Sequence, residues 1–215
     1  MTRRRLAILI SGRGSNMEAI LNAARDPRFP AEPVVVLSNR PDAKGLETAR
    51  TSGLDAIGLD HRAHGRDREA FERIMHAHLV EHDVELVALA GFMRLLTPWF
   101  VSEWSGRLLN IHPSLLPKYP GLDTHARALE AGDTVHGCTV HLVTPGLDEG
   151  PALGSAEIDV RPGDTPDTLA ARVLKGEHLL YPLCIAGLAT GSTSPVRRAV
   201  HVGEDEIRLL APDRW

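Results

Sequence analysis

The sequence predicts an α/β fold: a doubly wound, mostly parallel, Rossmann-like sheet with a mixed C-terminal half. Two observations support this fold class. Apolar runs of strand length alternate with segments whose apolar residues recur at helical spacing, as in repeated strand-helix units. The run VELVALAGF at 84–92 is also almost entirely apolar, which is typical of a strand buried on both faces of a parallel sheet.

In the first half of the chain, turn residues separate the apolar runs from the segments that favour helix. In chain order we expect a strand at 5–11, a helix at 15–26, a strand at 33–39, a helix at 43–53, a helix at 68–82 and a strand at 84–92. Gly53 is expected to close the second helix, because the left-handed residue that ends a helix is usually glycine.

The alternation changes after the strand RLLNI at 107–111, where a turn-rich loop begins. Further along we expect a short helix at 124–132, strands at 137–143 and 154–160, a long helix at 164–191 and a terminal hairpin at 199–210. Asp164 or Thr165 would cap the long helix, and Pro182 would kink or restart it.

The length of 215 residues fits one domain covering 1–215, with an N-terminal half at about 1–100, a second half at about 101–190 and a short C-terminal tail. The formal net charge of −4 argues against broad binding to nucleic acid or to an anionic membrane. A small anionic ligand is easier to reconcile with this charge. The sequence leaves open whether the chain is a monomer or a homodimer.

Cys138 and Cys184 both lie in apolar settings, so buried thiols in a reducing compartment are favoured over a disulfide. The N-terminal apolar run LAILI is too short for a signal peptide and much too short to span a bilayer. We therefore expect a cytoplasmic protein without a membrane partner.

The segment SGRGSN at 11–16 follows the first strand, and ligands of an open parallel sheet bind at the carboxyl ends of its strands. Its glycines permit positive φ, and the next helix offers free N–H groups, an arrangement that suits a phosphate. The match to a dinucleotide fingerprint is weak, because Met17 occupies the third glycine position. The alternative is a simple glycine turn in which Ser15 caps the helix.

The segment AGFMRLL at 90–96 places four apolar residues directly after a buried strand: Phe92, Met93, Leu95 and Leu96. Composition favours a place in the core for them, and an apolar slot for a ligand is the alternative. Arg94 is either a solvated side chain or a bidentate partner for a carboxylate.

The segment LLNIHPSLLPKYPG at 108–121 combines a strand end with a stiff loop. Asn110 and His112 are separated by one residue, so in an extended chain both side chains point to the same face. The prolines that follow limit how far the loop can relax. An amide and an imidazolium aimed at one point suit a developing oxyanion, and a histidine also moves protons. Taken alone, His112 is equally well explained as a structural residue.

A carboxylate would hold the imidazole in one tautomer and favour its charged form. Asp148, in the turn TPGLDEGP at 144–151, is the candidate, although aspartate is also a common turn residue. No nucleophile elbow of the G-x-S-x-G type occurs in the sequence. The helical histidines His76, His78 and His82 do not match the H-E-x-x-H zinc motif, so no metal is expected.

Taken together, ISGRGSN, AGFMRLL, LLNIHPSLLPKYPG, HGCTVHLV and LDEGP resemble the motifs of the folate-dependent formyltransferases, specifically the phosphoribosylglycinamide formyltransferase branch of purine biosynthesis. The resemblance covers roughly residues 5 to 190. It implies a formyltransferase fold and, as co-substrate, 10-formyltetrahydrofolate, whose formyl group is attacked by the amine of glycinamide ribonucleotide (GAR). It implies no covalent enzyme intermediate.

The resemblance also assigns residues. Asn110 and His112 would stabilise the oxyanion, His112 would move a proton, and Asp148 would keep His112 charged and order a relaying water. The substrate ribonucleotide would be held by Gly14, Ser15, Asn16 and Glu177. The folate would be bordered by Arg68, Met93, Arg94, Leu95, Leu96 and Asn110.

Two residues depart from the common pattern of this branch. Asp123 stands where histidine is usual, and Arg13 replaces an asparagine or lysine. The nearest alternatives to transfer are a formyltetrahydrofolate hydrolase, which shares the Asn-His-Asp set, and a nucleotide sensor that has lost catalysis. A tRNA-acting formyltransferase would normally carry a further, basic domain.

Overall fold

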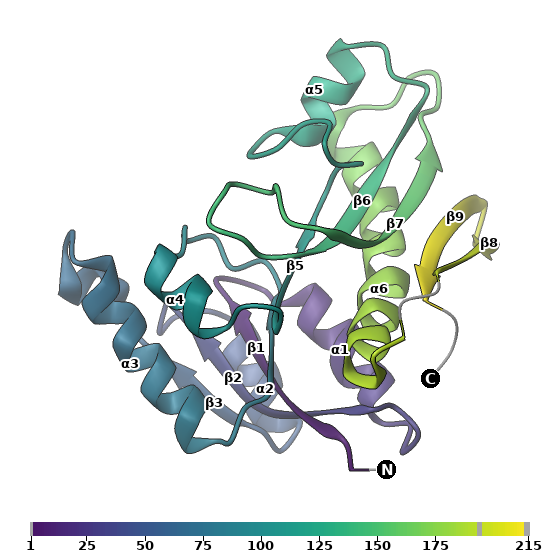
Figure 1. Ribbon diagram of the computed structural model, residues 1–215. Coiled ribbons are helices and arrows are strands. Elements are labelled where there is room, and N and C mark those ends of the chain that lie inside the picture. The colour runs from purple at the N-terminus through teal and green to yellow at the C-terminus, as the bar shows by residue number, and fades with distance from the viewer. Residues whose placement is uncertain (1, 193–194, 213–215) are drawn as a thin grey trace. The chain divides into compact units, whose positions relative to one another are not determined.

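The computed structural model describes residues 2–192 and 195–212 (Figure 1). It has a mixed α/β fold whose residues form two compact units. The first unit contains the described residues up to Asn110 together with Val143–Pro145, and the second contains Ile111–Leu142 and the described residues from Gly146 onward. Among the described residues, no helix is both long and apolar enough to cross a membrane.

The first unit is built on parallel strands in the order β3-β2-β1-β4-β5. Its elements are β1 (Arg4–Ile10), α1 (Ser15–Ala24), β2 (Ala31–Ser38), α2 (Gly45–Thr51), β3 (Asp55–Gly58), the 3₁₀ helix η1 (His61–His64), α3 (Arg68–Glu81), β4 (Leu86–Leu89), α4 (Pro98–Glu103) and β5 (Leu108–His112), whose last two residues belong to the second unit. The predicted doubly wound, parallel first half is therefore confirmed.

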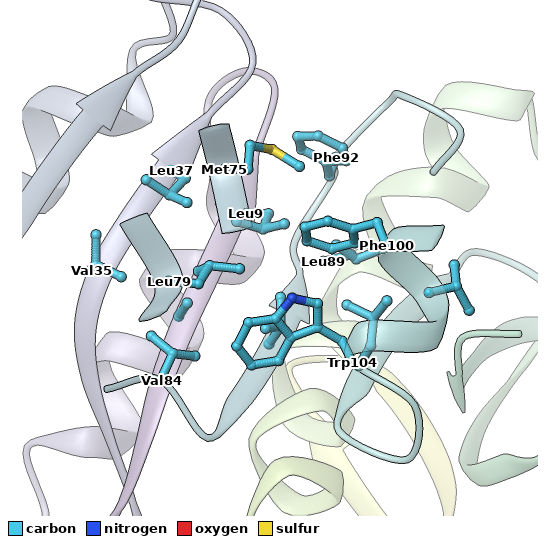
Figure 2. Close-up of a cluster of buried hydrophobic side chains, with 14 of the residues drawn as sticks. Leu9, Val35, Leu37, Met75, Leu79, Val84, Leu89, Phe92, Phe100 and Trp104 are labelled. Atoms are coloured by element: carbon cyan, nitrogen blue, oxygen red, sulfur yellow. The ribbon is translucent and has the colours of Figure 1, made fainter. Parts of the chain in front are cut away.

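One face of these strands packs against α3 and α4, and Figure 2 shows the buried cluster that results. The strands contribute Leu9, Val35, Leu37 and Leu89, α3 contributes Phe71, Met75 and Leu79, and the α4 region contributes Phe100, Val101 and Trp104. Burial of a side chain of this size stabilises the fold by about 1.5–3 kcal/mol. On the other face, α2 begins so close to Ile10 that a Cβ at Gly45 would lie 2.6 Å from Ile10 Cδ1.

Three short elements of the first unit were not expected from the sequence: β3, η1 and α4. The predicted strand at 84–92 is also shorter than expected, because β4 ends at Leu89 and Gly91 then turns the chain with a φ of 74°. A positive φ of this kind is favoured by glycine, which lacks a Cβ.

The second unit is antiparallel, with the strand order β6-β7-β9-β8. Its elements are α5 (Thr124–Glu130), β6 (Val135–Leu142), β7 (Ala152–Asp159), α6 (Pro166–Thr190), β8 (Pro195–Val202) and β9 (Asp205–Pro212). The predicted hairpin near the C-terminus is therefore confirmed as β8 and β9. The long helix α6 packs on β6, β7 and β9.

The structure tests two predictions for α6, its N-cap residue and the effect of Pro182. Thr165, and not Asp164, is the capping residue, and its side chain and that of Thr168 form a reciprocal capping box. The expectation that Pro182 restarts the helix is wrong, because α6 continues through Pro182 to Thr190. Surrounding side chains keep this part of α6 buried, and such packing offsets the helical hydrogen bond that proline cannot donate.

Candidate active site

The loop between β1 and α1 provides an N-terminal helix end that is open to a ligand. Gly14 is the N-cap residue with a φ of 80°, and no described side chain caps α1. The alternative in which Ser15 serves as the cap is therefore wrong. The first N–H groups of a helix have no partner within the helix and carry the positive end of its dipole, so this end favours an anion.

A pocket of about 490 Å³ lies around this loop within the first unit. Its lining residues are Ser11, Gly12, Arg13, Gly14, Ser15, Asn16, Asn39, Arg40, His61, Ala90, Gly91, Met93 and Arg94. Three arginines and a histidine are among these described residues, and no acidic residue is. The pocket therefore favours an anionic ligand, and it brings Gly14, Ser15 and Asn16 together with Met93 and Arg94.

The segment after β4 separates its apolar residues into two groups. Phe92 is buried in the core cluster, and Leu96 is half-buried against it. Met93 and Leu95, by contrast, are 71% and 60% exposed. The expectation that composition places all of these residues in the core is therefore wrong for Met93 and Leu95. Leu95 and Leu96 are not among the residues that line the pocket.

Two arginines lie near this segment. The guanidinium carbon of Arg94 is 5.4 Å from the centre of the Phe71 ring, which suits a cation–π contact. Arg68 is the first residue of α3 and is exposed. Both carry positive charge close enough to the carboxyl group of Glu72 to lower its pKa, against a larger upward effect of burial.

Asn110 and His112 are the third and fifth residues of β5. Asn110 is half-buried and pairs with Leu89 of β4 in the first unit. His112 belongs to the second unit, where it is 6% exposed.

Both ring nitrogens of His112 face an acceptor. Nδ1 lies 3.4 Å from Oδ2 of Asp148, and Nε2 lies 2.9 Å from the carbonyl oxygen of Tyr119. The carboxylate and the carbonyl therefore fix the orientation of the ring from both sides.

The loop that supplies the Tyr119 carbonyl is closed by its own hydrogen bonds. Ser114 Oγ donates to the Lys118 carbonyl at 2.6 Å, and the Leu116 N–H donates to Thr139 Oγ1 at 3.0 Å. These bonds hold the proline-containing loop against β6 within the second unit.

Asp148 is held in a left-handed backbone conformation with a φ of 55°. Its Oδ2 accepts a hydrogen bond from the Gly121 N–H at 2.9 Å. Its Oδ1 lies 3.7 Å from Nε2 of His141, a buried residue of β6. The carboxylate thus lies between two histidines, His112 and His141.

His141 was not singled out from the sequence. Burial lowers the pKa of His141, while its hydrogen bond to the Leu142 carbonyl and the charge of Asp148 act in the opposite direction. The available signal was a polar residue in the otherwise apolar strand HGCTVHLV, but its neighbour Asp148 is brought to it only by tertiary structure.

Glu177 lies on α6 and is buried within the second unit. No group of three or more histidine, cysteine, aspartate or glutamate residues in the described part of the chain is placed to hold a metal ion. Cys138 and Cys184 are free and buried, as predicted.

A positively charged pocket and a buried histidine–aspartate pair are typical of an enzyme that transfers a group with general acid–base help. The model of the Formyl transferase family matches residues 4–185, and the chain belongs to this family. It is 48% identical over 186 residues to the phosphoribosylglycinamide formyltransferase of Escherichia coli strain K12, covering 86% of this chain and 87% of that relative.

Solved structures support the same assignment. The phosphoribosylglycinamide formyltransferase of Brucella melitensis matches with 50% identity and a TM-score of 0.84, over 88% of this chain and 97% of that one. The glycinamide ribonucleotide transformylase 1 of Symbiobacterium toebii matches with 44% identity and a TM-score of 0.85, over 98% of this chain and 95% of that one.

Proposed function

We propose that Asn110, His112 and Asp148 carry the chemistry of this enzyme, which transfers the formyl group of 10-formyltetrahydrofolate to the amine of GAR in purine biosynthesis. The observation that carries the proposal is the buried His112, whose Nδ1 lies 3.4 Å from Oδ2 of the buried Asp148. A histidine held beside a carboxylate is suited to donate to an oxyanion and to move a proton through its other nitrogen, once that nitrogen exchanges the Tyr119 carbonyl for the substrate.

In the proposed reaction, the amine nitrogen of GAR attacks the formyl carbon and the carbonyl electron pair moves to oxygen. The Asn110 amide and the His112 imidazolium stabilise the oxyanion that forms. The attacking nitrogen then loses a proton, the bond between the formyl carbon and N10 of the folate breaks, and N10 takes up a proton. His112 and a water ordered by Asp148 carry the proton, and Asp148 keeps His112 charged.

The proposed contacts to GAR come from its phosphate end and from its ribose or glycinamide portion. Gly14, Ser15 and Asn16 hold its phosphate at the open end of α1, which is supported by the positive charge around that loop. Glu177 contacts the ribose or glycinamide portion. The position of Glu177 as a buried acidic residue on α6 supports this contact.

For the folate, we propose contacts from both apolar and charged residues. Met93 and Leu95 provide exposed apolar side chains next to the half-buried Leu96. Arg68 and Arg94 are also proposed to contact the folate, because their positive charge suits a carboxylate. Asn110 is the last residue proposed to contact it. We further propose a cytoplasmic location and either a monomeric or a homodimeric state.

Asn110→Ala and His112→Ala test the proposed roles. Each is expected to lower kcat by about two decades or more, as for loss of an oxyanion donor or acid, while the circular dichroism spectrum stays unchanged. His201→Ala is the matched control, since its side chain on β8 is 70% exposed. Near-normal turnover of both test variants would reject the assignment.

The assay follows tetrahydrofolate release from 10-formyltetrahydrofolate with and without GAR. The transferase releases tetrahydrofolate only when GAR is present. Release without GAR would favour the hydrolase alternative, and no release under either condition would favour the sensor. Neither alternative is favoured by the relatives, which are transferases by name.

A further inference from the structure

The segment from Gly91 to Thr97 is attached at its first end by Ser11, the residue that follows β1. The Ser11 N–H donates to the Gly91 carbonyl at 3.1 Å. The Met93 N–H donates to Ser11 Oγ at 2.8 Å, and Ser11 Oγ donates to Asn39 Oδ1 at 2.6 Å. Because the hydroxyl of Ser11 both accepts and donates, its orientation is fixed, and with it the position of the Met93 amide.

The other end of the segment is attached by Glu72, whose side chain is fully buried on α3. The Thr97 N–H donates to Oε1 of Glu72 at 2.9 Å, and the Thr97 hydroxyl donates to Oε2. Thr97 is also the N-cap residue of α4. Both carboxyl oxygens of Glu72 are therefore used by one residue, which fixes the point where the segment enters α4.

The burial of Glu72 is costly and requires compensation. Burial raises the pKa of Glu72, while the hydrogen bonds from Thr97 and the charges of Arg68 and Arg94 act in the opposite direction. Moving a carboxylate out of water costs desolvation free energy. This cost is offset only when hydrogen bonds reach both oxygens and a positive charge lies nearby. Glu72 therefore holds the backbone of the segment at Thr97 and feels the charges of Arg68, on its own helix, and of Arg94, within the segment.

Between these two attachments, the side chains of Met93 and Leu95 do not pack in the core. Met93 and Leu95 are mostly exposed, so their own packing does not order this part of the backbone. The four peptide units from Met93 to Thr97 are short enough that fixing both ends limits the conformations in between. A segment ordered before its ligand arrives avoids the entropic cost of ordering on binding.

We propose that Ser11 and Glu72 are positioning residues that hold the segment 93–96 in its folate-binding conformation before the folate binds. The inference rests on the proposed role of this segment in folate binding. Ser11 acts through the Met93 amide, and Glu72 acts through Thr97 and through the charges of Arg68 and Arg94. Neither residue contacts the reacting atoms.

Ser11→Ala and Glu72→Gln test the two ends separately. Glu72→Gln keeps the size of the side chain and one oxygen for the Thr97 N–H, but it removes the negative charge. Titration calorimetry with tetrahydrofolate is expected to give a Kd about tenfold higher for each variant, the effect of losing one well-placed hydrogen bond or charge. For Glu72→Gln the Kd for GAR is expected to change less than about twofold.

Amide hydrogen exchange supplies a readout that general destabilisation does not reproduce. In the protein without folate, exchange at the Met93 amide is expected to quicken in Ser11→Ala and exchange at the Thr97 amide in Glu72→Gln, with α1 and β1 unchanged. Ser11→Thr, which keeps the hydroxyl, is expected to restore the folate affinity.

Ser38→Ala is the matched control. Ser38 is a buried serine at the end of β2 whose hydroxyl accepts the Arg40 N–H at 3.1 Å and has no bond to the segment 91–97. Its folate affinity is expected to match that of the unmodified protein. Because Ser11→Ala is independent of Glu72, the test stands even where Glu72→Gln fails to fold.

A double variant with Met93→Ala and Leu95→Ala separates this inference from the proposed function. Unchanged tetrahydrofolate affinity in the double variant would contradict the proposal that the segment itself binds folate. Weaker binding in the double variant together with normal affinity and normal exchange in Ser11→Ala and Glu72→Gln would overturn the positioning role alone.

Discussion

Acidification is expected to destabilise the second unit through His136, which lies on β6 and is 1% exposed. Its Nε2 lies 3.1 Å from Nδ1 of His125, so protonation of both rings would place two positive charges side by side. Burial, followed by the charge of His125, lowers the pKa of His136 to about 4, and the charge of Asp133 acts in the opposite direction. Burial also lowers the pKa of His125.

The sign of the effect follows from proton binding by the folded and unfolded states. In the unfolded chain the imidazole titrates near 6.5, so between about pH 6.5 and about pH 4 the unfolded state binds a proton that the folded state excludes. The stability contributed by the neutral ring is fully present above pH 6.5 and is lost as the pH falls toward 4. One pKa unit corresponds to about 1.4 kcal/mol, so the total loss is about 3 kcal/mol.

Urea denaturation at several pH values between 7.5 and 4.5 measures this loss. His136→Gln removes the titrating group and keeps a polar side chain, so its free energy of unfolding is expected to fall less on acidification, by about 2–3 kcal/mol. His201→Gln, on the exposed face of β8, is the control and is expected to follow the unmodified protein. Parallel curves for the unmodified protein and His136→Gln would refute the reasoning.

Two further predictions concern packing. Gly137→Ala would force a Cβ against the Ala156 carbonyl oxygen and to within 3.0 Å of Leu115 Cδ2, so the urea midpoint should fall by an amount equivalent to about 3 kcal/mol or more, and an unchanged midpoint would contradict this packing. Cys138 and Cys184 are buried and burial raises the pKa of both thiols, so a colorimetric thiol reagent near pH 8 should react only after unfolding. Rapid reaction of either thiol in the folded protein would count against its burial.

The longer elements of the fold were predictable because their patterns extend over many residues. Helix α3 was expected at 68–82 and is found at Arg68–Glu81. The strand β3 has four residues, and its side chains are half-buried or exposed, so it gives no apolar run to recognise. Helix α4 has six residues, too few for helical periodicity to be distinguished from a loop.

The segment after β4 illustrates a different limit. Its composition favours the core, but only Phe92 is fully packed there, because the turn at Gly91 decides which side chains face inward. Sequence spacing carries no information about that turn. The same limit applies to His141, whose proximity to Asp148 depends on how β6 and the following turn are packed.

The C-terminal hairpin extends the structural requirements of the second unit beyond the part matched by the family. Asp205 of β9 is buried and accepts hydrogen bonds from Arg161 at 2.9 Å and Lys175 at 2.8 Å, and Arg172 lies 3.7 Å away. Shortening the chain to the matched range of 4–185 would remove Asp205 and leave Arg161, before α6, and Arg172 and Lys175, on α6, without this shared carboxylate. The hairpin thus supplies the negative charge that neutralises these cations. It should therefore be kept when chains of this family are shortened.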